Sequence, residues 1–271
     1  MFFQTHDGTR LAYEDHGQGE VVVLAASAML SADMWEYQIP FLVRNGYRCV
    51  ALDRRGHGRS DRPSGGYDLD TCADDLAALI EHLDLRDVTL AGHSMGGAET
   101  VRYLARHGAD RVRRAALISA TVPCLLRRDD NPQGLPPEAA EASLAALDDD
   151  RPGWLARQAQ AFFATHLGNA VSPAMIEHTV RMCLATSPWA VRECQRSVLA
   201  ADLRPDLATL ALPLLVVHGA ADMSAPVHLT GRRIAELVPH ADYREYPTAG
   251  HGLYYSHRAE LNAELLAFLK G

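Results

Sequence analysis

Cysteine is scarce in this sequence, and its spacing argues against the sites that cysteines usually build. The five cysteines are Cys49, Cys72, Cys124, Cys183 and Cys194. Their number is odd and no CxxC pair occurs, so we expect neither a disulfide framework nor a zinc site. The composition therefore predicts reduced thiols, a cytoplasmic protein and no bound metal.

Long apolar runs are also missing. The longest run, residues 21–30, is interrupted by Ser27 and is too short to cross a bilayer. The first residues, MFFQTHDGTRL, contain no apolar stretch of the length found in signal peptides. We therefore expect neither a membrane segment nor an export signal in this sequence.

The chain also lacks an excess of positive charge. Its 26 Lys and Arg residues face 34 Asp and Glu residues, which gives a formal charge of −8. Nucleic acids and anionic membranes are bound by basic surfaces, so neither is an expected partner. We expect a small-molecule substrate instead, and the composition leaves homo-oligomerisation open.

Short apolar runs alternate with amphipathic stretches along most of the chain. We predict strands at 11–15, 21–26, 49–52, 88–91, 115–118, 213–218 and 243–246, and helices at 35–45, 71–83, 95–107, 227–238 and 258–270. Strands that alternate with helices indicate a parallel sheet with right-handed crossovers. The pattern predicts the α/β class, and the length suits one domain with an insertion.

The alternation stops between residues 123 and 210. This segment opens with prolines and acidic residues and continues as helical stretches without a convincing strand. We interpret it as a helical cap, inserted into an α/β-type core that comprises residues 1–122 and 211–271.

A nucleophile motif lies between a predicted strand and a predicted helix. Residues 92–96, GHSMG, match G-x-S-x-G, in which the glycines permit a sharp turn that lifts Ser94 above the strand ends. The turn also directs the Met95 backbone N–H, at a helix N-terminus, toward a developing oxyanion. A solvated serine in a glycine-rich turn is the alternative, which the strand–turn–helix context disfavours.

A serine hydroxyl needs a base to become a nucleophile, and two later loops supply candidate partners. Asp222 follows the strand predicted at 213–218, and His251 follows the strand predicted at 243–246. Both therefore lie at the carboxyl ends of parallel strands, where the sites of open α/β sheets gather. We predict that His251 is the general base and that Asp222 holds its tautomer.

Other residues of the same types compete for these roles, since the chain has 13 histidines. We interpret His57 as structural, His93 as an elbow residue that points away from the hydroxyl, His218 as a packed core histidine, and His240 and His257 as surface residues. Asp242, the rival of Asp222, begins a strand and is interpreted as its cap.

Several segments together resemble one group of proteins. They are 53–60 (DRRGHGRS), 90–97 (LAGHSMGG), 215–222 (LVVHGAAD) and 249–253 (AGHGL). These segments are similar to those of the bacterial non-haem haloperoxidase (perhydrolase) and arylesterase branch of the α/β-hydrolases, and the similarity extends almost end to end. The resemblance implies a mostly parallel eight-stranded sheet flanked by helices, with a helical cap insertion. It also implies a cofactor-free enzyme that cleaves small esters and forms peracids as a side activity.

The chain departs from this family after the predicted strand 21–26. The family usually carries His-Gly, an aromatic residue and proline where this chain has Ala26, Ser27, Ala28 and Met29. The residue at position 28 would supply the second oxyanion-hole N–H. Because that donor is a backbone group, Ala28 can still provide it, although Ser27 replaces a glycine that eases the conformation of the loop.

The cap and the strand ends should enclose an apolar substrate pocket. Its candidate lining residues are Ala28, Met29, Met95, Val122, Phe162, Phe163, Met182, Trp189, Met223 and Leu253. For Phe162, Phe163 and Trp189, an ordinary core position is the competing interpretation. The motifs have no neighbouring lysine or arginine that would require an anionic substrate.

Three functional hypotheses follow from these residues. The first is a serine hydrolase that cleaves a small carboxylic ester or lactone through an acyl-enzyme, with perhydrolysis as a side activity. The second is a non-hydrolytic tailoring enzyme, such as a lyase or cyclase, and the third is a ligand-binding protein on the same scaffold. The altered loop at 26–29 motivates the second hypothesis, and the three catalytic candidates argue against the third.

Overall fold

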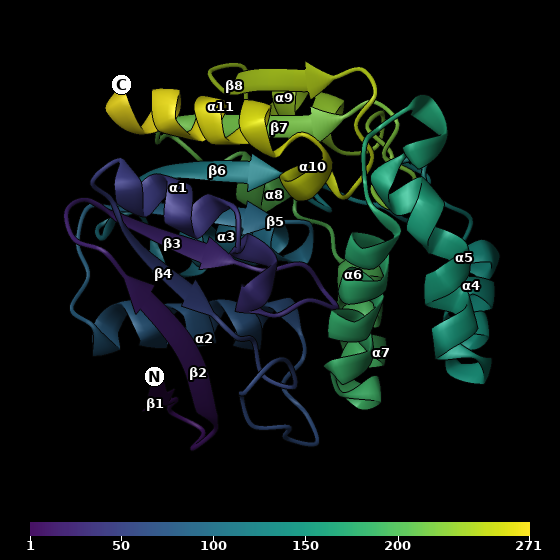
Figure 1. Ribbon diagram of the computed structural model, residues 1–271, viewed down its shortest axis with the longest axis horizontal. Helices are drawn as coiled ribbons and strands as arrows, with labels where there is room; N and C mark the ends of the chain where they lie inside the picture. The colour runs from purple at the N-terminus through teal and green to yellow at the C-terminus, as the bar shows by residue number, and fades with distance from the viewer.

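The computed structural model describes all 271 residues, and eight strands form one sheet in it (Figure 1). They are β1 (Phe2–Gln4), β2 (Arg10–His16), β3 (Val21–Ala25), β4 (Arg48–Leu52), β5 (Val88–His93), β6 (Val112–Ile118), β7 (Leu214–Gly219) and β8 (Asp242–Tyr246). Their order in the sheet is β1-β2-β4-β3-β5-β6-β7-β8. Pairing is antiparallel for β1 with β2 and for β2 with β4, and parallel for the other strands. The predicted mostly parallel eight-stranded sheet is confirmed.

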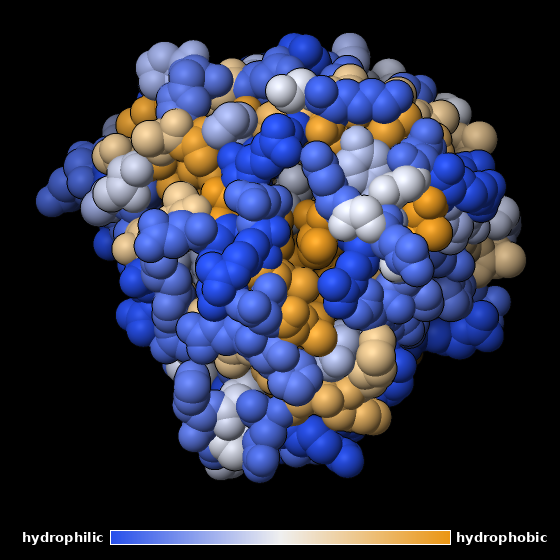
Figure 2. All heavy atoms as spheres, turned by 90° about the vertical axis from the view of Figure 1, so that its left-hand side faces the viewer, coloured by the Kyte–Doolittle hydropathy of each residue, from blue (hydrophilic) through white to orange (hydrophobic).

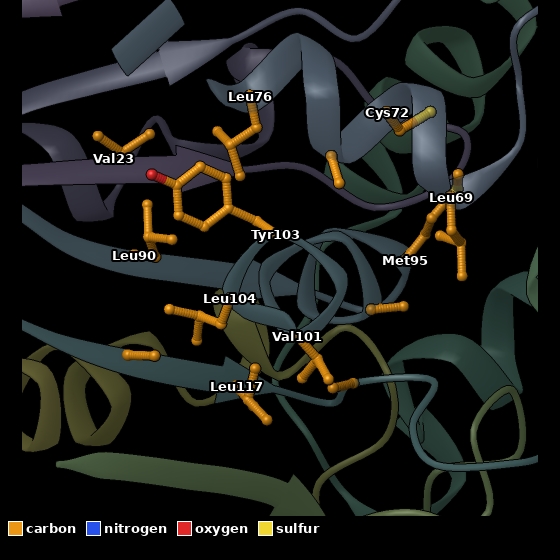
Figure 3. Close-up of a cluster of buried hydrophobic side chains, with 14 of the residues drawn as sticks. Val23, Leu69, Cys72, Leu76, Leu90, Met95, Val101, Tyr103, Leu104 and Leu117 are labelled. Atoms are coloured by element: carbon orange, nitrogen blue, oxygen red, sulfur yellow. The ribbon is translucent and has the colours of Figure 1, made fainter. Parts of the chain in front are cut away.

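Helices cover both faces of the sheet, and the alternation of strand residues determines which helix each face contacts. Val23, Leu90 and Leu117 share a buried cluster with α2 (Leu69–His82) and α3 (Met95–His107). Figure 3 shows these side chains between the sheet and the two helices. On the other face lie α1 (Gln38–Arg44) and α11 (Arg258–Lys270), against strand residues such as Val22 and Val217. Each large apolar side chain buried in this way contributes about 1.5–3 kcal/mol to folding.

Two predicted helices begin later than the sequence pattern suggested. The helix predicted at 35–45 is instead a short 3-10 turn, η1 (Ala32–Trp35), followed by α1. Pro40 is the third residue of α1 and lacks an N–H, so it is tolerated in the first turn but would interrupt a helix that started several residues earlier. The helix predicted at 227–238 begins at Gly231, as α9 (Gly231–Leu237).

The segment predicted as a cap connects β6 to β7. It contains α4 (Pro137–Asp149), α5 (Arg151–Phe163), the 3-10 turn η2 (Thr165–Leu167), α6 (Pro173–Ala185), α7 (Pro188–Ala200) and the short α8 (Arg204–Leu207). In Figure 1, α4 to α7 lie beyond the arrowheads of the central strands, so they cover the carboxyl ends of the sheet. The sequence pattern predicts helices in this segment but not the bounds of each helix. Its division of the chain at 122/123 and 210/211 stays a prediction.

The outer surface of the molecule is largely polar. Figure 2 shows the face that lies away from α4 to α7, where hydrophilic side chains predominate and hydrophobic ones emerge in the gaps between them. None of the helices combines the length and the apolar character that crossing a bilayer would require. The five cysteines are all buried and unpaired.

Candidate active site

Ser94 occupies the turn between β5 and α3, as the G-x-S-x-G motif predicts. Its backbone has φ 56° and ψ −118°, a left-handed conformation that is uncommon for residues other than glycine. Such a turn is characteristic of a nucleophile held above the carboxyl end of a strand. The Ser94 side chain lines a cavity beneath the cap helices.

The glycines on both sides of Ser94 are required by close backbone packing. A side chain at Gly92 would collide with the backbone of Gly96, and a side chain at Gly96 would collide with the backbone of Ala25 and Ala26. The sharp turn therefore brings α3 against the ends of β5 and β3. Met95 is the first residue of α3, so its backbone N–H has no acceptor within the helix and is free to bind an anionic oxygen.

Asp222 and His251 form a buried hydrogen-bonded pair. His251 Nδ1 lies 2.7 Å from Asp222 Oδ2, and both side chains are almost fully buried. The other carboxylate oxygen, Oδ1, accepts hydrogen bonds from the backbone N–H groups of Ser224 (2.9 Å) and Ala225 (2.8 Å). This arrangement directs Nε2 of His251 away from Asp222, and His251 lines the same cavity as Ser94. No hydrogen bond joins the Ser94 hydroxyl to His251 here, and such contacts often tighten only when substrate binds.

Charge and burial act in opposite directions on Asp222. Burial alone would raise the pKa of its carboxyl group, but the neighbouring His251 and His218 overcome this effect and hold the pKa below its ordinary value. Asp222 is therefore an anion at neutral pH. An anion at this position stabilises the positive charge that His251 acquires when it accepts a proton.

The competing histidines have other roles in the structure. His93 is buried and its Nε2 lies 2.8 Å from the His251 carbonyl oxygen, where it can donate to the loop that carries His251. Burial, reinforced by the charge of His251, lowers the pKa of His93 to about 3, so this ring is neutral. His218 lies 3.4 Å from Asp222 and 2.8 Å from the carbonyl of Ala225. Its packed position agrees with the sequence-based interpretation and adds a contact with Asp222 that the sequence did not indicate.

The remaining rivals lie outside the cavity. His57 is fully buried behind the loop 26–29, while His240 and Asp242 are exposed and His257 is partly exposed. Asp242 forms an ion pair with Arg244 on the surface. None of these four side chains lines the cavity that Ser94 and His251 share.

The loop after β3 faces Ser94 across the cavity. Ser27, Ala28 and Met29 all line the cavity. Neither the Ala28 nor the Met29 backbone N–H donates a hydrogen bond within the protein, although both residues are more than 90% buried. Buried N–H groups are normally paired, so two adjacent free donors in the cavity that Ser94 lines are suited to bind a ligand oxygen.

The cavity has a volume of about 360 Å³ and extends from Ser94 under the cap helices. Most of its lining is apolar, and no Asp, Glu, Lys or Arg side chain contributes to it. Its walls include Leu144 and Leu147 of α4, Leu155 and Phe162 of α5, Thr179 and Val180 of α6, and Val198 and Leu199 of α7. A volume of this size suits a small organic ligand, and the lining favours a neutral one.

The cavity includes some of the residues predicted for the substrate pocket and leaves out others. Ala28, Met29, Met95, Phe162, Phe163 and Met223 line the cavity, whereas Val122, Met182, Trp189 and Leu253 do not. Val122 and Leu253 are fully buried among the apolar side chains of the core. Trp189 is 53% exposed, and its indole N–H donates to the carbonyl of Ser64 on the outer surface.

Several lining residues were not predicted, because their direction depends on how the cap helices pack. Leu144, Leu155, Thr179 and Val198 are examples. Apolar periodicity marks one face of each helix as buried, but it does not say whether that face contacts the sheet, another helix or a cavity. We find no cluster of three or more His, Cys, Asp or Glu side chains that could hold a metal ion.

The chain is similar in sequence to proteins of known family. The sequence model for the alpha/beta hydrolase fold matches residues 16–258. A non-haem chloroperoxidase from Kitasatospora aureofaciens is 39% identical over 268 residues, which cover 98% of each chain. A bifunctional esterase/perhydrolase from Acinetobacter calcoaceticus is 33% identical over 273 residues, which cover 99% of each chain.

Solved structures agree with the sequence relatives. The crystal structure of a bromoperoxidase from Bacillus anthracis superimposes with a TM-score of 0.94 at 34% identity, over the full length of both chains. The chain belongs to the α/β-hydrolase fold family and is similar to its non-haem haloperoxidase and esterase members.

Proposed function

We propose that this protein hydrolyses neutral carboxylic esters through an acyl-enzyme on Ser94. The observation that carries the proposal is one cavity that contains an elbow serine, the His251–Asp222 pair at 2.7 Å and unpaired backbone N–H groups. These are the nucleophile, the oriented base and the oxyanion donors that acyl transfer needs. The esterase among the relatives supports the same reaction class.

In the proposed reaction, the Ser94 oxygen attacks the ester carbon while Nε2 of His251 accepts the hydroxyl proton. The carbonyl oxygen becomes an oxyanion that the N–H groups of Met95 and Ala28 hold. When the tetrahedral intermediate collapses, the carbon–oxygen bond of the leaving group breaks and His251 donates its proton to the departing alcohol. Water then attacks the carbonyl carbon of the acyl-enzyme while His251 accepts a proton from it. When this second tetrahedral intermediate collapses, the bond to the Ser94 oxygen breaks and His251 returns the proton to that oxygen, which releases the acid and restores Ser94.

The cavity lining supports a neutral substrate with apolar groups. Burial of an unpaired carboxylate or ammonium there would be costly, since no side chain of opposite charge lines the cavity. Lactones and other activated esters fit the same description. Hydrogen peroxide is an alternative acceptor to water in the second step, as the names of the chloroperoxidase and perhydrolase relatives suggest. A cytoplasmic location and homo-oligomerisation stay predictions.

Turnover of p-nitrophenyl esters by the wild type and by Ser94→Ala tests the proposal. We expect hydrolysis by the wild type and a loss of kcat by about 10⁴-fold or more in the variant, as in other serine hydrolases that lose their nucleophile. Circular dichroism should show that the variant is folded. If Ser94→Ala hydrolyses the ester at the wild-type rate, the acyl-enzyme mechanism is wrong. If the folded wild type hydrolyses no ester, a non-hydrolytic or ligand-binding function becomes the better account.

A further inference from the structure

Arg54 contacts the oxyanion loop, residues 26–29, from the side opposite the cavity. Its guanidinium donates to the carbonyl oxygens of Ala26 (2.6 Å) and Ser27 (3.0 Å). The same group forms a two-pronged ion pair with Glu99 of α3, in which the second contact measures 3.0 Å. Arg54 therefore connects the oxyanion loop with the helix that starts at the proposed nucleophile.

Two more side chains hold the next two carbonyls of the loop. Nε2 of His57 lies 2.6 Å from the carbonyl oxygen of Ala28, and the Thr186 hydroxyl donates to that of Met29 at 3.0 Å. All four carbonyls of residues 26–29 are thus bound by side chains from other segments. The loop is therefore held at every one of these carbonyls by a side chain that is distant in the sequence.

The held carbonyls determine where the loop's N–H groups point. In a planar trans peptide, the C=O of one residue and the N–H of the next point in opposite directions. The Ser27 carbonyl, which Arg54 binds, shares its peptide plane with the Ala28 N–H. The Leu30 backbone N–H also donates to this carbonyl, at 3.2 Å. By fixing the carbonyl on the outer side together with Leu30, Arg54 directs the Ala28 N–H toward the cavity, where it lacks any acceptor in the protein.

The environment of Arg54 suits a fixed support. Its side chain and that of Glu99 are only 4% and 6% exposed. Burial alone would lower the pKa of Arg54, but the charge and hydrogen bonds of Glu99 overcome this and raise it, so the guanidinium keeps its charge. A buried ion pair does not by itself show that Arg54 stabilises the fold. The feature that distinguishes Arg54 is its contact with the carbonyls of the oxyanion loop.

We propose that Arg54 is the main positioning residue of the oxyanion hole, with His57 and Thr186 as supports, in a chain whose loop reads Ala-Ser-Ala-Met. This inference rests on the proposed ester hydrolysis. Arg54 does not touch the substrate: it acts by fixing the peptide plane that carries the Ala28 N–H. The loop's geometry is then supplied by side chains of the segment 53–60 rather than by a glycine within the loop itself.

The adjacent Arg55 provides a matched control. It forms an equally buried ion pair with Asp75 (2.6 Å; side chains 2% and 4% exposed), yet its guanidinium does not contact the oxyanion loop. Arg54→Lys and Arg55→Lys each keep a positive charge beside the carboxylate. Lysine cannot reproduce the planar fork of arginine, so Arg54→Lys loses the simultaneous hydrogen bonds to Glu99 and to the two carbonyls.

Steady-state kinetics of the two variants with a p-nitrophenyl ester tests the inference. We expect Arg54→Lys to lower kcat by about 10- to 100-fold and to leave KM within about threefold of the wild type. A misplaced N–H donor weakens the hydrogen bond to the oxyanion, which forms in the transition state and not in the bound ester. The affinity for a trifluoromethyl ketone, which forms an oxyanion on the nucleophile, should fall in parallel with kcat/KM. Affinity for the matching methyl ketone should not change. Arg55→Lys should stay within about threefold of the wild type in all three measurements.

One further variant keeps the test decisive if Arg54→Lys folds poorly, and one further measurement applies to both arginine variants when they are folded. Thr186→Val removes one hydroxyl without changing shape, and should lower kcat by about 3- to 10-fold. Hydrogen exchange of a peptide that covers residues 26–34 should accelerate in Arg54→Lys but not in Arg55→Lys. Equal kinetic losses in both arginine variants, or unchanged kcat and exchange in Arg54→Lys, would overturn the inference while leaving ester hydrolysis intact. A wild type that neither turns over esters nor binds the trifluoromethyl ketone would overturn both proposals.

Discussion

At the scale of single residues, Ser94 combines a proposed chemical role with an unfavourable backbone conformation. Its φ of 56° and ψ of −118° place its backbone in a region of φ/ψ space that only glycine, which lacks a Cβ, occupies freely. Conformations of this kind cost of order 1–3 kcal/mol and persist where the surrounding structure imposes them. Here the close packing at Gly92 and Gly96 imposes the turn.

This strain predicts a difference between two inactive variants. Ser94→Gly should be more stable than Ser94→Ala by about 1 kcal/mol, because glycine relieves the strain while its larger unfolded-state entropy offsets part of the gain. Urea denaturation of both variants measures the difference. Equal stability, or a more stable alanine variant, would contradict the backbone geometry described for the elbow.

The same scale shows which site residues a sequence can reveal. Ser94, Asp222 and His251 each sit in a short loop after a strand, and glycine-rich motifs identify the loops that carry Ser94 and His251. Neighbourhood in the sequence and residue type are weaker guides to the residues that line the cavity. Leu253 adjoins a motif, but its side chain enters the core because neighbours along a chain point in different directions. Trp189 was judged by residue type, which does not reveal that its side chain lies on the outer surface.

At the scale of secondary-structure elements, patterns predicted most of the core but little of the cap. The bounds of α3 and α11 agree with the prediction, and β3, β4, β5, β7 and β8 each match to within two residues. β1 has three residues and no alternation long enough to detect, and it was missed. The strands are recognisable because a sheet buried on both faces selects continuous apolar runs.

The cap helices show the limit of such reasoning. Each of them packs against other helices and around a cavity, so its apolar residues do not define a single partner. Hydrogen bonds between distant segments also link the cap to the loop that carries His251. The N–H of Gly252 donates to the Phe162 carbonyl of α5 at 2.7 Å, and the Asn169 amide donates to the carbonyl of Thr248 at 2.8 Å. No local pattern in the sequence indicates these contacts.

At the scale of the whole molecule, neutral buried histidines connect stability to pH. Burial, followed by the charge of Arg54, lowers the pKa of His57 to about 4, below the ordinary histidine value of about 6.5. Between these two pH values the unfolded chain binds a proton that the folded protein does not bind. The folded state is therefore disfavoured as the pH falls through this window, and His57 has no such effect above it.

The effect of His57 can be isolated by comparing pH dependences. The free energy of unfolding should rise with pH between about 4 and 6.5, and His57→Gln should reduce this slope by about 1.4 kcal/mol per pH unit, which corresponds to one proton. Denaturant titrations of both proteins at several pH values provide the slopes. Identical slopes would show that His57 is protonated to the same extent in the folded and unfolded states.

The central claim is that the cavity contains a working serine nucleophile, and intact-protein mass spectrometry after incubation with a fluorophosphonate tests it most directly. Such a reagent reacts with a serine that a neighbouring base activates and traps it as a stable tetrahedral adduct. The account predicts one adduct per chain in the wild type, located at Ser94, and none in Ser94→Ala. No adduct on the folded wild type, or an adduct that persists in Ser94→Ala, would contradict it.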